Sequence, residues 1–152
     1  MQPESWVLVF FFIAAAVIVS GCSMLLKEPD VSVKAVSPVS VGLRELVLDV
    51  TLDVYNPNAV GITLKTLSFD VFYQKRGAWV FLSHGEQTGI TIRPGSNEVT
   101  VPVSVENSAL LGSLFEVVTQ GEITLKIDGF AAPDFRLFAP KVPFSRTVTV
   151  SL

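Results

Sequence analysis

Apolar and polar side chains alternate with a period of two over most of the chain after residue 30, and this alternation constrains the fold more than any other feature. In the clearest segment the apolar residues are Leu46, Leu48, Val50, Leu52 and Val54. Successive side chains of a β-strand point to opposite faces, so this segment predicts a strand with one face in the core and one in water. Asn56-Pro57-Asn58 follows and predicts a turn, because proline cannot continue a ladder and asparagine tolerates turn dihedrals.

The same alternation predicts further short strands at 31–35, 62–73, 78–83, 88–92, 99–105, 122–130, 135–139 and 142–150. In 62–73 the apolar phase changes near Thr66, which indicates a β-bulge or a bend. Pro102 cannot donate a ladder hydrogen bond, so its strand is expected to lie at an edge or to be bulged.

Between two of these strands the spacing becomes helical. Leu110, Leu111, Leu114 and Phe115 favour a helix over 108–119, with Asn107 or Ser108 as the N-cap and Gly121 as its stop. Eight or nine strands with one helix predict a mainly β fold. We expect an antiparallel β-sandwich over 31–152, similar in size to immunoglobulin and fibronectin type III domains, after a linker at 22–30.

The amino terminus carries an apolar run of 14 residues, Trp6–Val19, which is the length of a signal-peptide core. Val19-Ser20-Gly21-Cys22 follows and resembles the lipobox of prokaryotic lipoproteins. The resemblance implies cleavage after residue 21 and a lipid on the Cys22 thiol. An uncleaved transmembrane helix is the alternative, because the 21 residues Trp6–Leu26 are uncharged and long enough to span a bilayer. The n-region, Met1–Ser5, lacks Lys and Arg, which weakens the signal-peptide pattern.

Both interpretations place a hydrophobic signal or anchor helix before the domain and make the membrane its first partner. The lipoprotein interpretation predicts a lipid-anchored protein on the extracytoplasmic face of the cell membrane.

Composition excludes several function classes. The formal net charge is only −3, so there is no basic arm for nucleic acid and no electrostatic case for docking on anionic headgroups. One cysteine and one histidine exclude a disulfide framework, a zinc finger and a His/Cys metal cluster. Asp49 and Asp53 lie about 13 Å apart along one strand, too far to share a calcium ion, and are interpreted as a solvated face. We therefore expect no cofactor and no metal.

The single histidine, His84, is interpreted as part of a solvated turn between two strands. A hydrolase is the competing interpretation, but no G-x-S-x-G pattern is present. That interpretation would gain ground only if the fold brought His84 beside a serine and an acid. The sequence therefore predicts a protein that is not an enzyme.

A set of aromatic residues occupies the off-core phase of the predicted strands: Tyr55, Phe72, Trp79 and Phe81. If a neighbouring element covers them, they are core; if they are exposed together, they mark a contact surface for a partner or a membrane. Phe130, Phe135 and Phe138 are expected to close the open end of the sandwich.

The order of these elements resembles the water stress and hypersensitive response (WHy) domain of the type 2 late embryogenesis abundant proteins. The resemblance rests on Asn56-Pro57-Asn58, Gly95-Ser96, Val101-Pro102-Val103, the helix near Ser108 and Gly121-Glu122-Ile123. It covers the whole predicted domain. It implies a folded two-sheet domain, a role in desiccation or other stress, and no catalytic residues.

The function expected from this resemblance is a membrane-anchored, non-enzymatic protection module that contacts partly unfolded client proteins or envelope components. The alternative is an envelope assembly or adhesion subunit that binds one partner through an exposed strand edge or the aromatic residues.

Overall fold

The computed structural model describes residues 26–42, 44–118 and 121–151. The apolar run and Cys22 lie outside the described residues, so the anchor stays a prediction. Within the described part the chain forms seven strands and one helix. They are β1 (Asp30–Val41), β2 (Leu46–Asn56), β3 (Ile62–Lys75), β4 (Ala78–Ile92), β5 (Gly95–Val105), α2 (Ser108–Val118), β6 (Glu122–Pro133) and β7 (Val142–Ser151).

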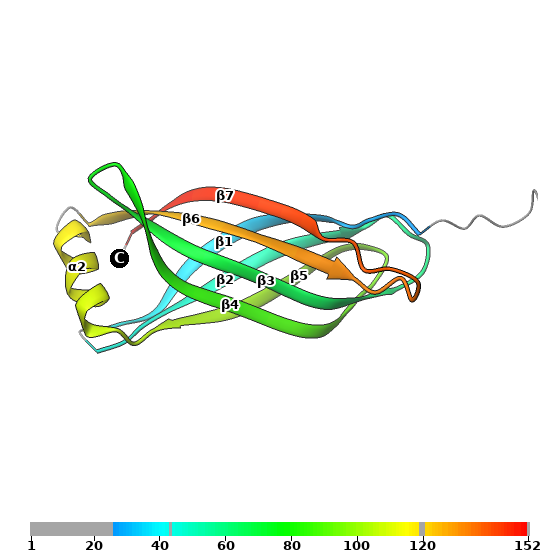
Figure 1. Ribbon diagram of the computed structural model, residues 1–152, viewed down its shortest axis with the longest axis horizontal. Coiled ribbons are helices and arrows are strands. Elements are labelled where there is room, and N and C mark those ends of the chain that lie inside the picture. Colours follow the sequence, from blue (N-terminus) through cyan, green and yellow to red (C-terminus); the bar gives the residue numbers. More distant parts are fainter. Residues whose placement is uncertain (1–25, 43, 119–120, 152) are drawn as a thin grey trace, which may run out of the picture.

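The strands form two antiparallel sheets, one in the order β1-β2-β5 and one in the order β4-β3-β6-β7. The sheets face each other across one hydrophobic core, and α2 lies at one end (Figure 1). The opposite end holds the start of β1 and the β6–β7 connection. We call these the helix end and the Lys27 end.

Hydrogen bonds join the edges of the two sheets. Arg146 of β7 donates a side-chain hydrogen bond to the Val33 carbonyl of β1. On the other side the Ser83 hydroxyl of β4 donates to the Ser104 carbonyl of β5 at 2.7 Å. At both places an edge strand of one sheet therefore lies against an edge strand of the other. This leaves less backbone free for pairing with another chain.

The predicted alternation in β2 is confirmed. Its apolar residues are all buried, whereas Asp49 and Asp53 are half-buried on the outer face of the three-stranded sheet. The predicted bulge is confirmed too, because the pairing of β3 with β6 slips by one residue between Leu64 and Thr66. Pro102 lies on β5, which is an edge strand of its sheet, as expected.

Two predictions about the strands were wrong, and the first is the separation of 78–83 from 88–92. Segments 78–83 and 88–92 belong to one continuous strand, β4. Gly85 follows His84, which we expected in a turn between the two segments. It faces the ring of Phe69, where an added Cβ would lie 2.5 Å from Cζ. A register shift beside Phe72 also changes the apolar phase of β4, which hid its continuity from the sequence pattern.

Segment 135–139 is a loop, so the count falls short of the expected eight or nine strands within the described ranges. Asp134 accepts a hydrogen bond from the backbone N–H of Arg136, whose φ is 63°. These features form a turn, and the apolar residues around it had imitated a strand. Phe135 is buried as expected, but Phe138 is exposed rather than closing the end of the domain.

The helix prediction is confirmed in its described part. The Asn107 side chain accepts hydrogen bonds from the N–H groups of Ala109 and Leu110 at 3.0 and 3.2 Å, which makes it the N-cap. Gly121 has a φ of 80°, as a residue that stops a helix requires. Leu111 and Leu114 are buried against the open end of the core. Across the described ranges, no helix combines the length and apolarity that spanning a membrane would need.

Candidate functional site

Three of the four predicted aromatic residues gather on the outer face of the four-stranded sheet. Phe72 pairs with Phe81 across β3 and β4, and their rings meet edge to face with centroids 5.9 Å apart. Trp79 lies two residues before Phe81, and it pairs with Gln74. Trp79 and Phe81 are 38% and 48% exposed. We call Phe72, Trp79 and Phe81 the aromatic patch.

Tyr55 does not belong to this patch. It lies on β2, in the other sheet, where it is 49% exposed and pairs with Asp30 and Ser96. The sequence pattern identified its outward phase, but the assignment of strands to sheets separates it from the other three.

A lysine that the sequence pattern did not single out lies beside the aromatic patch. The Lys126 ammonium lies 5.0 Å from the centroid of Phe72 and 5.4 Å from that of Trp79, within the range of cation–π attraction. It also pairs with Asp128 at 2.8 Å. Partial burial raises the pKa of the Asp128 carboxyl, but hydrogen bonds from Lys126 and Ser145 outweigh this and leave the pKa lowered. The patch therefore presents aromatic surface beside the Lys126–Asp128 ion pair.

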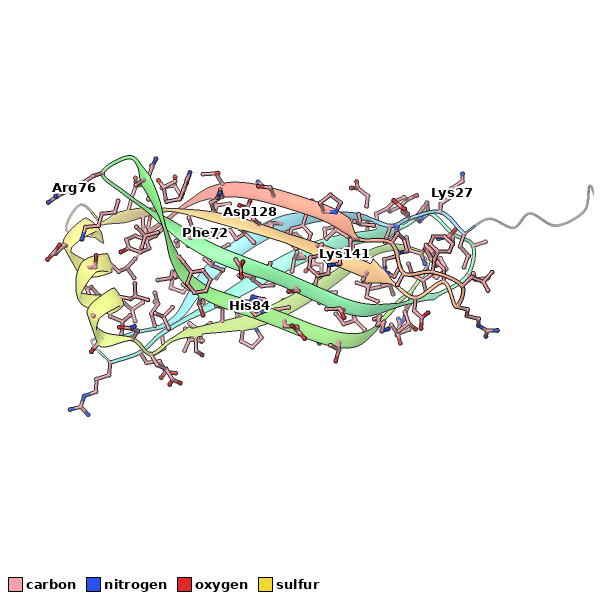
Figure 2. The ribbon with its side chains drawn as sticks, viewed as in Figure 1. Lys27, Phe72, Arg76, His84, Asp128 and Lys141 are labelled. Carbon is pink, nitrogen blue, oxygen red and sulfur yellow. The ribbon has the colours of Figure 1, made fainter. Side chains whose placement is uncertain are left out.

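The fold brings His84 beside both a serine and acids, on the same sheet face. Figure 2 shows His84, Phe72 and Asp128 along the sheet. They lie between Arg76 at the helix end of the molecule and Lys27 at the other end. His84 Nδ1 lies 2.7 Å from Asp70 Oδ1, and Nε2 lies 3.5 Å from Ser68 Oγ. Nε2 also lies 3.6 Å from Glu86 Oε2. His84 therefore belongs to a strand and not to the turn that the sequence suggested.

This arrangement differs from a Ser-His-Asp hydrolase in three respects. His84 Nε2, the atom that a triad turns to the serine, also faces Glu86, and the hydrogen bond that His84 donates to Asp70 is the largest cause that raises the pKa of the ring. The face is open, with His84 and Asp70 side chains both 47% exposed. Ser68 pairs with Glu86 and Phe130 inside the sheet, where strand N–H groups point along the ladder, whereas an oxyanion hole needs N–H groups directed at the reacting oxygen.

The Asn-Pro-Asn turn is a hydrogen-bonded structural unit. Asn56 is the one buried polar residue of the described core, at 1% exposure. Its amide nitrogen donates to the Val60 carbonyl at 2.9 Å, and its Oδ1 accepts from Asn58 N and Nδ2 at 3.0 and 2.8 Å. Pro57 between them is exposed. These contacts hold the chain in a turn at Asn56-Pro57-Asn58.

Asn58 also holds the segment that precedes β1. The backbone N–H of Lys27 donates to Asn58 Oδ1 at 2.7 Å, and Asn58 Nδ2 donates to the Lys27 carbonyl at 2.8 Å. The sequence gives no local sign of this contact, because the two residues are 31 positions apart.

Beside Lys27 lies a depression of about 420 Å³, whose lining includes Leu26, Ile62, Phe135 and Arg136. It carries no cluster of titratable groups. No group of three or more His, Cys, Asp or Glu side chains suited to a metal ion occurs among the residues that the structure describes.

The sequence is similar to a protein family and to two archaeal proteins. The family model for late embryogenesis abundant protein, LEA_2, matches residues 51–148. Uncharacterized protein MJ1138 of Methanocaldococcus jannaschii is 33% identical over 122 residues, which cover 80% of this chain and 68% of that protein. A second protein of that organism, MJ0943, is 28% identical over 78% of this chain but only 27% of its own length.

Two solved structures share the fold at low identity. The solution structure of AT1g01470 from Arabidopsis thaliana has a TM-score of 0.61 at 17% identity and covers 86% of this chain and 87% of that one. The solution structure of a proposed late embryogenesis abundant (LEA) protein, At2g46140.1, has a TM-score of 0.61 at 15% identity, covering 98% and 85%. Because the family model matches more than half of the sequence, the chain belongs to the late embryogenesis abundant family LEA_2.

Proposed function

We propose that this protein is a non-enzymatic stress-protection module of the WHy type, held at the membrane as a lipid-anchored, extracytoplasmic protein. Membership of the LEA_2 family supports a stress-related role. The strand orders β1-β2-β5 and β4-β3-β6-β7 support a sandwich of the immunoglobulin and fibronectin type III class. The lipobox-like Val19-Ser20-Gly21-Cys22 supports the anchor.

The aromatic patch carries the proposed mechanism. Trp79 and Phe81 keep large apolar surfaces in water, although the other outward side chains of this face, such as Ser68, Asp70 and Glu86, are polar. Grouped exposed apolar side chains mark contact surfaces. Partly unfolded proteins expose apolar segments as water is lost, and a rigid aromatic surface beside Lys126 would bind such segments weakly and limit their aggregation.

The test is aggregation of a labile enzyme during drying, with the purified protein added. The protein should reduce aggregation, whereas the double variant Trp79→Ser with Phe81→Ser should lose this effect. The matched control is Val39→Ser with Val41→Ser, which removes exposed apolar side chains from β1 and should keep the effect. Protection equal to that of an inert protein, or full protection by the patch variant, would contradict the proposal.

The envelope-subunit alternative uses the same patch with one specific partner. Crosslinking in the native membrane separates the two functions: a single stoichiometric partner, lost with the patch variant, would favour the alternative. A broad set of weakly captured clients would favour protection.

A further inference from the structure

We infer that the Lys27 end of the domain is a lipid-docking surface, which rests its exposed apolar loops and basic side chains on the membrane that holds the anchor. This inference rests on the proposed membrane anchoring. It adds the part of the folded domain that meets the lipid and the orientation in which the domain stands.

The sequence between Cys22 and the folded domain is short. Cys22 precedes Lys27 by five residues, which span at most about 17 Å when fully extended. Asn58 binds both the N–H and the carbonyl of Lys27, so the folded domain begins at that point. A lipid on Cys22 thus keeps the Lys27 end within about one domain radius of the bilayer. An uncleaved helix ending at Leu26 would hold it closer still.

The Lys27 end exposes large apolar side chains to water. Leu137 is 94% exposed and Phe138 is 56% exposed, both in the β6–β7 connection. Val60, after the Asn-Pro-Asn turn, is 49% exposed, and Leu26 is 38% exposed. A water-exposed leucine at the tip of a loop gains free energy when it enters the interfacial region of a bilayer, which lies within about 5–10 Å of the headgroups.

The Lys27 end also carries several charged side chains. Exposed basic side chains at the Lys27 end are Lys27, Arg93, Arg136 and Lys141. Figure 2 shows Lys141 toward the same end as Lys27. The acids there are Glu28, Asp30 and Asp134, so the end is locally basic although the whole chain is weakly acidic. Each Lys or Arg close to an anionic surface adds about 1 kcal/mol of attraction.

This local distribution differs from the net charge of the whole chain, on which the expectation of no electrostatic docking rests. A balance of −3 averages over both ends and hides the basic surface that the fold assembles from three separate loops. Exposed apolar side chains that share one end with four basic and three acidic side chains suit an anionic lipid interface better than a protein partner of neutral surface.

The experiment measures the depth of the Lys27 end in vesicles. The full chain carries Cys22→Ala, which keeps the apolar run as anchor, and a single new thiol from Leu137→Cys bears an environment-sensitive fluorophore. Arg76→Cys, at the helix end, is the matched control. Vesicles of phosphatidylcholine and phosphatidylglycerol contain lipids with a fluorescence quencher near the headgroup. Both labelled positions are exposed, so neither substitution disturbs the core.

Docking predicts that the chain floats with the vesicles and that the label at 137 shifts to shorter wavelength and is quenched, while the label at 76 is unchanged. Equal signals at both positions in chain that floats would overturn docking and leave the anchor intact. Failure to float would overturn docking, whereas the lipid on Cys22, which this variant lacks, is tested by the intact mass of the native protein. Adding Arg136→Glu and Lys141→Glu should abolish any increase of quenching with phosphatidylglycerol; a preserved increase would contradict the electrostatic contribution.

Discussion

Phe69 shows how a single side chain determines the residues around it. Its ring lies in the core between Gly85 on β4 and Gly129 on β6, which are its register partners on both sides. A Cβ on Gly129 would lie 2.4 Å from the Phe69 Cβ and 2.8 Å from a Phe144 ring atom. The two glycines therefore make room for an aromatic ring in the sheet, which explains why β4 contains a residue that resembles a turn signal.

Alanine at either glycine should destabilise the domain. Gly85→Ala and Gly129→Ala overpack the core and should each lower the free energy of unfolding by about 1–3 kcal/mol. Gly112, in α2, has open space where its Cβ would be, so Gly112→Ala should raise the free energy of unfolding by about 0.5–1 kcal/mol. Urea unfolding of the three variants checks this; equal effects at positions 85 and 112 would refute the packing argument.

Asn56 stabilises the fold through the hydrogen bonds of its buried side chain. Asn56→Ala leaves the Asn58 N–H and the Val60 carbonyl without this partner, so the free energy of unfolding should fall by about 1–3 kcal/mol. Ser40→Ala, on an exposed position of β1, is the control and should change the value by less than about 0.5 kcal/mol. A stability loss no greater than that of the control would show that the turn holds without Asn56.

Strand pairing brings His84 and Asp70 together, and their interaction gives stability a dependence on pH. Asp70 raises the pKa of His84 above its ordinary value of 6.5 in the folded state. The contribution is therefore fully present below the unfolded pKa and is lost as the pH rises through the folded value. Because both side chains are half-exposed, solvent screening keeps the effect small.

Asp70→Asn tests this pairing. The variant should lower the pKa of His84, measured by the chemical shifts of the single imidazole in an NMR titration. The stability difference between wild type and variant should be larger at pH 5.5 than at pH 9. Glu86→Gln should lower the same pKa by less, because Asp70 supplies the largest contribution. An unchanged His84 pKa in the Asp70 variant would contradict the geometry.

The elements divide into those that local pattern predicts and those that need the tertiary fold. The alternation in β2, the bulge near Thr66 and the Asn107 cap are local signals, and each is confirmed. The continuity of β4 depends on Phe69, which lies on another strand. The loop at 135–139 depends on Asp134 and on the positive φ of Arg136.

The same distinction holds for the candidate site. Alternation gave Phe72, Trp79 and Phe81 the off-core phase and left open whether another element covers them. Their position on one outer face, the addition of Lys126 and the separation of Tyr55 follow from register and sheet assignment. The Asp70–His84 pair and the Lys27–Asn58 contact join distant segments in the same way. Neither contact can be predicted from the sequence without knowing which segments lie next to each other.

The whole molecule has two ends and an exposed side with different properties. The Lys27 end carries exposed apolar loops and lies next to the proposed anchor in the sequence, and α2 covers the other end. A domain that stands on its Lys27 end holds the four-stranded sheet roughly upright, with the aromatic patch exposed laterally above the membrane. In this orientation anchoring and client contact use separate surfaces, so loss of the patch should leave membrane attachment unchanged.

The intact mass of the protein extracted from its native membrane tests the lipid anchor, on which both the location and the orientation depend. The account predicts a chain that begins at Cys22 and carries the added mass of a lipid. A mass that corresponds to the unmodified chain from Met1 would contradict the lipoprotein assignment and the extracytoplasmic location that follows from it.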